Sequence, residues 1–143
     1  MTNDGRFGFL ISPTVGRGMF RFQLIIDGNL IGDEEPCLLG TAMRQLGSIA
    51  DLKDRRLDAL SSDPTSVLFT LRSDEELHDR TTVALAESFD SWRINAYRHE
   101  GRVVFLATEV RKNEPPSLIL VSTVDLIEYN QIVNSVRSCW ESH

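Results

Sequence analysis

The sequence predicts an α+β domain, with a largely antiparallel sheet and two main helices packed on one face. Three observations predict it: apolar residues alternate near the start of the chain, two later runs have helical spacing, and a hairpin pattern occupies the second half. A chain of 143 residues can bury one core, and no change of composition marks a boundary. We therefore expect a single domain over residues 1–143.

The first predicted elements are strands. Apolar residues alternate over 7–11 and again over 20–26. Residues 27–29, Asp-Gly-Asn, form a strong turn motif because glycine and asparagine tolerate positive φ. A return strand is expected to begin at Leu30.

A helix is predicted to follow this hairpin. Pro36 suits the first helical position, and the three carboxylates before it suit the positive end of the helix dipole. The apolar face of this helix consists of Leu38, Leu39, Ala42, Met43, Leu46, Ile49 and Ala50. Residues 51–60 either continue the helix after a bend or form a second short one.

The middle of the chain is predicted to contain a strand and a short helix. Alternation over 67–71 follows a break at Ser62-Asp63-Pro64, which predicts a third strand. Ser73 to Glu76 has the pattern of a capping box, with Ser73 as the cap of a short helix. Residues 81–88 fit either a strand or a helix.

The second half is predicted to form a hairpin, a further strand and a C-terminal helix. Residues 92–97 and 103–110 flank a turn at 99–101. A loop over 112–116 leads to a buried strand over 118–121. Ser122 or Thr123 would cap the last helix, whose narrow apolar seam is Leu126, Tyr129, Val133, Val136 and Trp140.

Composition excludes several classes of function. A net charge of −6 disfavours a nucleic-acid binder, which needs cationic surface, and favours a basic protein partner. No apolar run is long enough to span a bilayer, and the start of the chain lacks the basic residues of a secretory signal. Two distant cysteines do not form a disulfide framework. We expect a cytoplasmic protein that binds neither nucleic acid nor membrane.

No pattern in the sequence predicts catalytic chemistry. Gly28 and Gly32 lack the lysine and glycine spacing of a phosphate loop. The acidic run 33–35 fits a solvated turn better than a metal site, and 74–76 fits the first turn of a helix. Cys37, predicted in a helical first turn, and Ser88 both lack the context of a nucleophile. We therefore expect no catalytic residues, no metal and no cofactor.

A surface strand is the better candidate for function. Arg93, Asn95 and Tyr97 alternate with apolar residues, which predicts a polar, exposed face of one strand. Arginine and tyrosine are enriched in the hot spots of protein interfaces, although an ordinary solvated face has the same pattern. Together with the acidic clusters, this strand favours a binding module over an enzyme.

Two segments resemble the immunity proteins of bacterial polymorphic-toxin and contact-dependent growth-inhibition systems. One is GMFRFQLIIDGNLIGDEEPCLLGTAMRQL, Gly18 to Leu46, with a strand, a glycine turn, Ile-Gly-Asp and a helix. The other is ESFDSWRINAYRHEGRVVFLATEV, Glu87 to Val110, with its Phe-Asp-x-Trp-x-Ile hairpin. The resemblance covers a little over a third of the chain, and its motifs are structural rather than catalytic.

The resemblance implies a small cytoplasmic protein without activity of its own. Such a protein binds the C-terminal domain of a cognate toxin and blocks its active site or its access to substrate. Many of these toxins are basic nucleases, so an acidic inhibitor can associate quickly with them. The expected partner-binding residues are Asp33, Glu34, Glu35, Asp74, Glu75, Glu76, Glu87, Asp90, Arg93 and Tyr97.

Two alternatives from other functional classes stay open. One is a small α+β enzyme or ligand-binding domain with a scattered pocket, for which Cys37 and His78 are the first residues to test. The other is a self-associating adaptor or structural subunit that pairs through an edge strand. The sequence predicts no oligomeric state.

Overall fold

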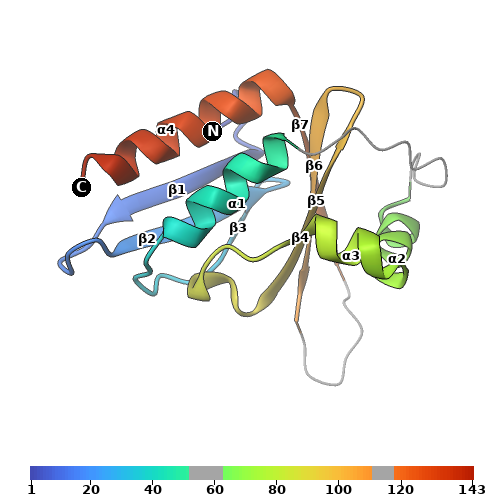
Figure 1. The fold of residues 1–143 in the computed structure, drawn as a ribbon, viewed down its shortest axis with the longest axis horizontal. Helices are drawn as coiled ribbons and strands as arrows, with labels where there is room; N and C mark the ends of the chain where they lie inside the picture. Colours follow the sequence, from blue (N-terminus) through green and yellow to red (C-terminus); the bar gives the residue numbers. More distant parts are fainter. Residues whose placement is uncertain (52–62, 111–117) are drawn as a thin grey trace.

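The computed structural model describes residues 1–51, 63–110 and 118–143 (Figure 1). Strands within this part of the chain pair into two antiparallel sheets, which confirms the predicted α+β class. Most of the helix expected over 51–60 and the loop expected over 112–116 lie outside the described residues. The elements are β1 (Phe7–Pro13), β2 (Phe20–Ile26), β3 (Asn29–Ile31), α1 (Gly40–Ala50), α2 (Pro64–Ser73), α3 (Glu75–Thr81), β4 (Thr82–Val83), the 3₁₀ helix η2 (Glu87–Phe89), β5 (Trp92–His99), β6 (Arg102–Glu109), β7 (Ile119–Asp125) and α4 (Leu126–Glu141).

The first sheet has the order β1-β2-β3 and follows the predicted hairpin. Ile26 pairs with Asn29, so Asp27 and Gly28 form a two-residue turn with φ angles of 50° and 75°. Positive φ at both positions is typical of the turn type that matches the twist of the flanking strands. The predicted turn is confirmed.

The second sheet has the order β4-β5-β6-β7 and contains the predicted hairpin of β5 and β6. Glu100 and Gly101 form its turn, again with positive φ at both positions. Every residue of β6 from Val103 to Thr108 is buried. A strand can be buried on both sides only where each face of its sheet is covered.

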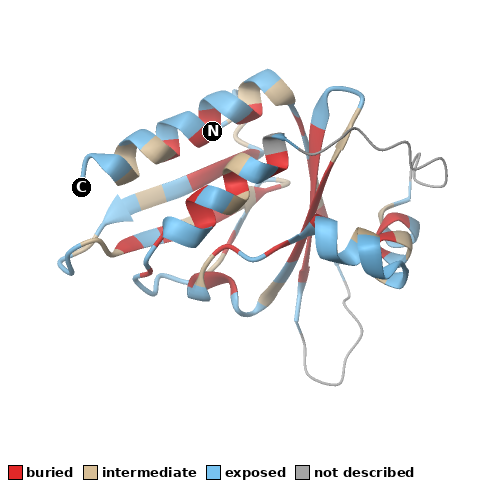
Figure 2. Cartoon of the chain, viewed as in Figure 1, coloured by how far each residue is buried: buried red, intermediate tan, exposed pale blue. Residues whose placement is uncertain are grey.

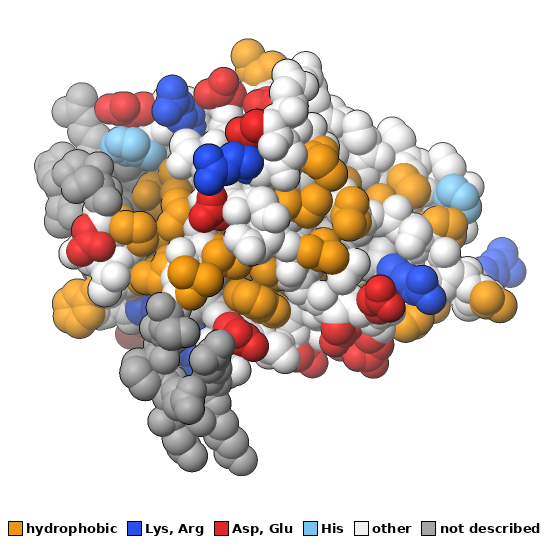
Figure 3. Space-filling model, turned by 180° about the vertical axis from the view of Figure 1, so that it is seen from behind, with side chains coloured by type: hydrophobic (Ala, Val, Ile, Leu, Met, Phe, Trp, Pro, Cys, Tyr) orange, Lys and Arg blue, Asp and Glu red, His pale blue; other side chains and the backbone are white. Residues whose placement is uncertain are grey.

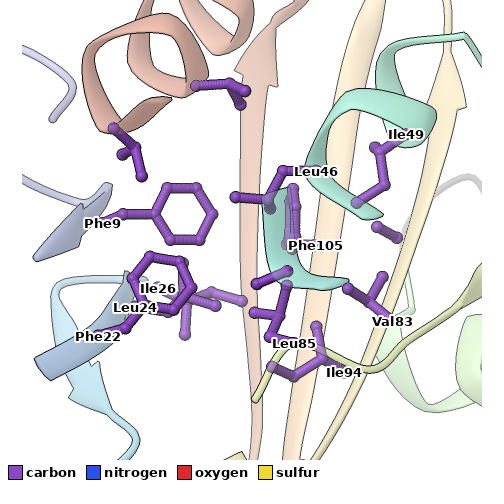
Figure 4. Close-up of a cluster of buried hydrophobic side chains, with 14 of the residues drawn as sticks. Phe9, Phe22, Leu24, Ile26, Leu46, Ile49, Val83, Leu85, Ile94 and Phe105 are labelled. Carbon is purple, nitrogen blue, oxygen red and sulfur yellow. The ribbon is translucent and has the colours of Figure 1, made fainter. Parts of the chain in front are cut away.

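The first sheet, α1 and α4 cover one face of the second sheet (Figure 1). Phe7 of β1 lies against Phe105 of β6 with ring centroids 5.0 Å apart. Figure 4 shows side chains of β2, α1 and β6 pointing into this shared core, and Figure 2 shows that the opposite side of α4 is exposed. The seam predicted for α4 is confirmed, because Tyr129 and Val133 are buried and Trp140 packs at the edge of the core.

The pair α2 and α3 covers the other face, and this corrects the strand predicted over 67–71. Asp63 caps α2 by accepting a hydrogen bond from the Thr65 amide at 3.1 Å, and Pro64 follows as the first helical residue. Val67, Leu68 and Leu71 then lie on one helical face against the sheet, while Phe69 is exposed. The alternation of Val67, Phe69 and Leu71 was therefore no indication of a strand.

Three helix starts differ from the predicted ones. Asp74, not Ser73, caps α3 and accepts a hydrogen bond from the Leu77 amide, because Ser73 still belongs to α2. Neither Ser122 nor Thr123 caps α4, since β7 continues to Asp125. The helix expected from Pro36 begins at Gly40 instead.

The late start of α1 has a clear cause in the backbone. Cys37 exchanges both of its backbone hydrogen bonds with Phe20, at 2.8 and 2.9 Å, which holds the chain extended. Cys37 therefore lies in a β-bridge and is fully buried, not in a helical first turn. Its thiol donates to the carbonyl of Glu35 at 3.2 Å.

A buried hydrogen bond joins α4 to α1. Tyr129 donates to the Leu46 carbonyl at 2.7 Å, and burial raises the pKa of this hydroxyl above its ordinary value.

Replacing Tyr129 by Phe keeps the ring but leaves a buried carbonyl without this donor, so we expect the free energy of unfolding to fall by about 1–2 kcal/mol. Tyr97→Phe is the matched control, because the Tyr97 hydroxyl has no hydrogen-bond partner among the described residues, and its expected cost is below about 0.5 kcal/mol. Equal losses in urea denaturation of the two variants would contradict this assignment.

Candidate functional site

Two acidic segments that are far apart in the sequence meet on one surface. The amide of Asp33 donates to the carbonyl of Ser88 at 2.8 Å, which ties the segment after β3 to η2. Ser88 is buried, and its hydroxyl donates to the Phe22 carbonyl at 2.9 Å, so η2 is also fixed to β2. The exposed carboxylates on both sides of this connection form what we call the acidic ridge: Asp33, Glu34, Glu35, Glu87 and Asp90.

Gly32 allows this close approach. Its φ is +93°, and a Cβ atom built on it would lie 3.0 Å from the ring of Phe89 in η2. The ring of Phe89 in turn contacts Phe22 edge-on, with centroids 5.8 Å apart. The ridge is thus a rigid corner of the fold and not a loose acidic loop.

A cleft of about 780 Å³ lies next to the ridge. Its walls come from the start of α1, the ends of α2 and α3, β4, η2 and β5. Its lining includes Glu87 and Asp90 of the ridge as well as Arg72, His78 and Arg93. The volume is within the usual range of small-molecule and peptide pockets, and carboxylates and cations share its surface.

Arg72 is the most constrained cation of the cleft. One of its terminal nitrogens, Nη2, donates to Asn95 Oδ1 at 3.2 Å and to Thr108 Oγ1 at 3.0 Å. Burial, followed by the charge of Arg93, lowers the pKa of Arg72 below its ordinary value. Within the described residues, no carboxylate lies within 4 Å of its guanidinium. A half-buried cation therefore faces the cleft without a counter-charge.

The structure corrects the predicted polar strand face. Arg93 is exposed, but Asn95 and Tyr97 are only 3% and 7% exposed because α2 and α3 cover this face of β5. Tyr97 packs with Val67 and Leu106 in the smaller core. The expectation of an exposed tyrosine is therefore wrong.

The remaining predicted residues, Asp74, Glu75 and Glu76, lie apart from the ridge. They occupy the start of α3 beside α2, whereas the end of α3 leads to β4 and the cleft (Figure 1). Asp74 is used as the helix cap, and Glu76 forms an ion pair with Arg80 at 2.9 Å.

Three residues of the cleft were not singled out from the sequence. Trp92 and the exposed Leu38 line it, and Arg72 enters it from the last turn of α2. An arginine at the end of a helix is a recognisable pattern. Arg72 was not recognised as such a residue because a strand was predicted over 67–71. Tryptophan and arginine are the side chains most enriched in interface hot spots.

The two residues named for an alternative enzyme have different surroundings in the structure. His78 lies on the surface of α3 at the cleft, whereas Cys37 is buried in its β-bridge and is not among the residues that line the cleft. Among the described residues, no group of three or more His, Cys, Asp or Glu side chains is arranged to hold a metal ion. No helix in this part of the chain has both the length and the apolar composition needed to cross a membrane.

The outer face of the first sheet is a second notable surface. Leu10 and Leu30 are 40% and 52% exposed there, and Ile25, which pairs with Leu30, is half-buried. Figure 3 shows hydrophobic side chains gathered on this side of the molecule, with acidic side chains along the lower edge.

Comparisons of the chain with protein-family models, with curated proteins and with solved structures found no match.

The junction of the ridge gives a testable prediction. Gly28→Ala and Gly32→Ala both place a Cβ at positive φ, which costs about 1–2 kcal/mol. A Cβ at position 32 also meets Phe89, whereas one at position 28 meets nothing within 4 Å. We expect Gly32→Ala to lower the free energy of unfolding by about 1–3 kcal/mol more than Gly28→Ala, because the ring must shift. Equal midpoints in guanidinium denaturation would show that the close approach adds nothing.

Proposed function

We propose that this protein neutralises a cognate bacterial toxin domain by binding to it through the acidic ridge. The observation that carries the proposal is the convergence of the segment 33–35 with Glu87 and Asp90 on one rigid corner. None of these five carboxylates forms an ion pair with a cation of the described residues. Their charge is thus available to a basic partner.

Electrostatics supports the choice of partner. Fixed charges of one sign raise the association rate with an oppositely charged protein, and they do so more strongly at low salt. A basic nuclease domain, whose active site is built for phosphates, has the complementary surface. The ridge would then cover that site and block access to the substrate, with no chemical step by this chain.

Side chains of the kinds that are common in protein interfaces lie beside the ridge and support a stable complex. Trp92, which is partly buried, and the exposed Arg93 line the cleft together with Leu38, which is 68% exposed. An interface that combines an apolar centre with charged flanks can slow dissociation as well as speed association. Trp92 and Leu38 replace Tyr97 as the expected partner contacts beside Arg93.

Co-expression tests the neutralising activity. The partner to try is the C-terminal domain of a large secreted protein encoded beside this chain, and cells that express this domain should grow only when this protein is present. A complex of the two purified proteins should elute as one species in gel filtration. Continued growth arrest, or a genome without such a neighbouring gene, would count against the proposal.

Charge reversal tests which surface binds. We expect Glu34→Lys, Glu87→Lys and Asp90→Lys together to reduce the association rate about tenfold or more at low salt, with a smaller effect at high salt. The matched control reverses Glu75, Glu76 and Asp79 on α3, which changes the net charge equally. Stopped-flow measurements should show a much smaller loss for the control. If the two triple variants behave alike, net charge and not the ridge steers the encounter.

A further inference from the structure

We infer that the cleft beside β4 contains a carboxylate-binding site formed by Arg72 and Arg93. The expected ligand is a single carboxylate group, such as an acidic side chain or a chain terminus of a bound partner. The inference rests on the proposed function only for the origin of that carboxylate, because the site itself can be tested without a partner.

The sheet places the two arginines next to each other. Thr108, which accepts a hydrogen bond from Arg72 at 3.0 Å, is the direct cross-strand partner of Arg93. Asn95, which accepts from the same nitrogen at 3.2 Å, lies two residues along β5 on the same face as Arg93. Directly opposed residues have Cβ atoms about 4.5–5.5 Å apart, so Arg72 is anchored to two neighbours of Arg93 on the same face of the sheet.

The anchoring leaves the binding part of Arg72 available. A guanidinium has five N–H donors, and both hydrogen bonds of Arg72 come from Nη2. Nη1 and Nε have no hydrogen-bond partner within the described residues and are not buried. An arginine fork of this kind fits the two oxygens of a carboxylate.

Neither of the two arginines forms an ion pair with a carboxylate of the described residues. Arg93 is exposed, and no carboxylate of the described chain lies within 4 Å of it. The burial of Arg72 and, after it, the charge of Arg93 destabilise the charged form of Arg72, which lowers the pKa of that side chain. A bound anion would relieve both effects, since arginine keeps its proton in the neutral range.

Two carboxylates in the lining of the cleft determine which type of anion is favoured. Glu87 and Asp90 line the same cleft and repel a second negative charge. A phosphate group at neutral pH carries nearly two charges, whereas a carboxylate carries one. A carboxylate is therefore favoured, most of all when a cationic group close to it can meet Glu87 or Asp90.

Two tryptophans provide a reporter and its control. Trp92 lines the cleft, whereas Trp140 lies on α4 outside it. Sodium acetate, sodium phosphate and sodium chloride would be titrated at equal ionic strength while the two indole N–H signals are followed by NMR. We expect acetate to shift the Trp92 signal with saturation, phosphate to bind more weakly, and Trp140 to stay in place.

Substitutions then assign the binding to the arginines. Arg93→Gln and Arg72→Lys should each weaken acetate binding about tenfold, the first by removing a charge and the second by removing the fork. Arg21→Gln, which removes an exposed arginine of β2 outside the cleft, should leave it unchanged. Arg93 is exposed, so its variant remains informative even if Arg72→Lys impairs folding.

Three results would overturn the inference: acetate acts no differently from chloride, Arg93→Gln binds acetate as tightly as the unchanged protein, or phosphate binds more tightly than acetate. Each of these results leaves the ridge experiment unaffected. Conversely, a toxin domain that ignores charge reversal on the ridge would refute the proposed function without bearing on acetate binding.

Discussion

Burial of β6 on both faces is the constraint from which the rest of the architecture follows. Val103 and Phe105 point into the larger core, whereas Val104 and Leu106 point into the smaller one. Each large apolar side chain removed from water contributes about 1.5–3 kcal/mol, so neither face can be left open. The chain solves this by placing the first sheet with α1 and α4 on one side and α2 with α3 on the other (Figure 1). The acidic ridge and the cleft lie where these two layers of covering elements end.

The cleft forms where the coverings stop at the edge of the sheet. β4 has only two residues and pairs with Asn95 and Ile94 alone, so Trp92 and Arg93 at the start of β5 pair with β6 on one side and with no strand of the described residues on the other. Polar residues occupy this border: the Asn95 amide donates to Thr81, and its oxygen accepts from Arg72. Buried polar groups of this kind are stable only when they are paired. Arg72 thus serves the fold through Nη2, while its remaining donors face the solvent.

Much of the fold could be predicted from the sequence because its indications are local. The turns at Asp27-Gly28 and Glu100-Gly101 contain glycine next to a residue that also adopts positive φ, and both hairpins follow from them. The prediction for the region of α2 was wrong because two sequence patterns compete there. Val67, Phe69 and Leu71 alternate like a strand, but Asp63-Pro64 is a helix start, and tertiary packing against Tyr97 favours the helix. In retrospect the cap and the spacing of Val67, Leu68 and Leu71 were the more reliable indication.

The candidate site was less accessible to prediction for a physical reason. The acidic residues of the ridge were recognised, but their convergence depends on the hydrogen bond between Asp33 and Ser88 and on the contact of Gly32 with Phe89, which join distant segments. Exposure of Tyr97 was predicted from alternation alone. Alternation separates the two faces of a strand, but it does not tell whether a second layer covers the polar one. The polar face of β5 is in fact covered at Asn95 and Tyr97 and open at Arg93.

The charges of this surface divide into two groups with different physical roles. Carboxylates on an exposed corner act over a Debye length of about 8–10 Å and affect mainly the rate of encounter. Arginines held by buried polar groups act at contact distance and with a defined direction, so they affect orientation and dissociation. Glu87 and Asp90 connect the two groups, because they are part of the ridge and also line the cleft that contains the arginines. A partner attracted to the ridge would therefore arrive beside a cleft in which Arg72 and Arg93 form no ion pair with a carboxylate of the described residues, and a carboxylate on that partner would fix its register.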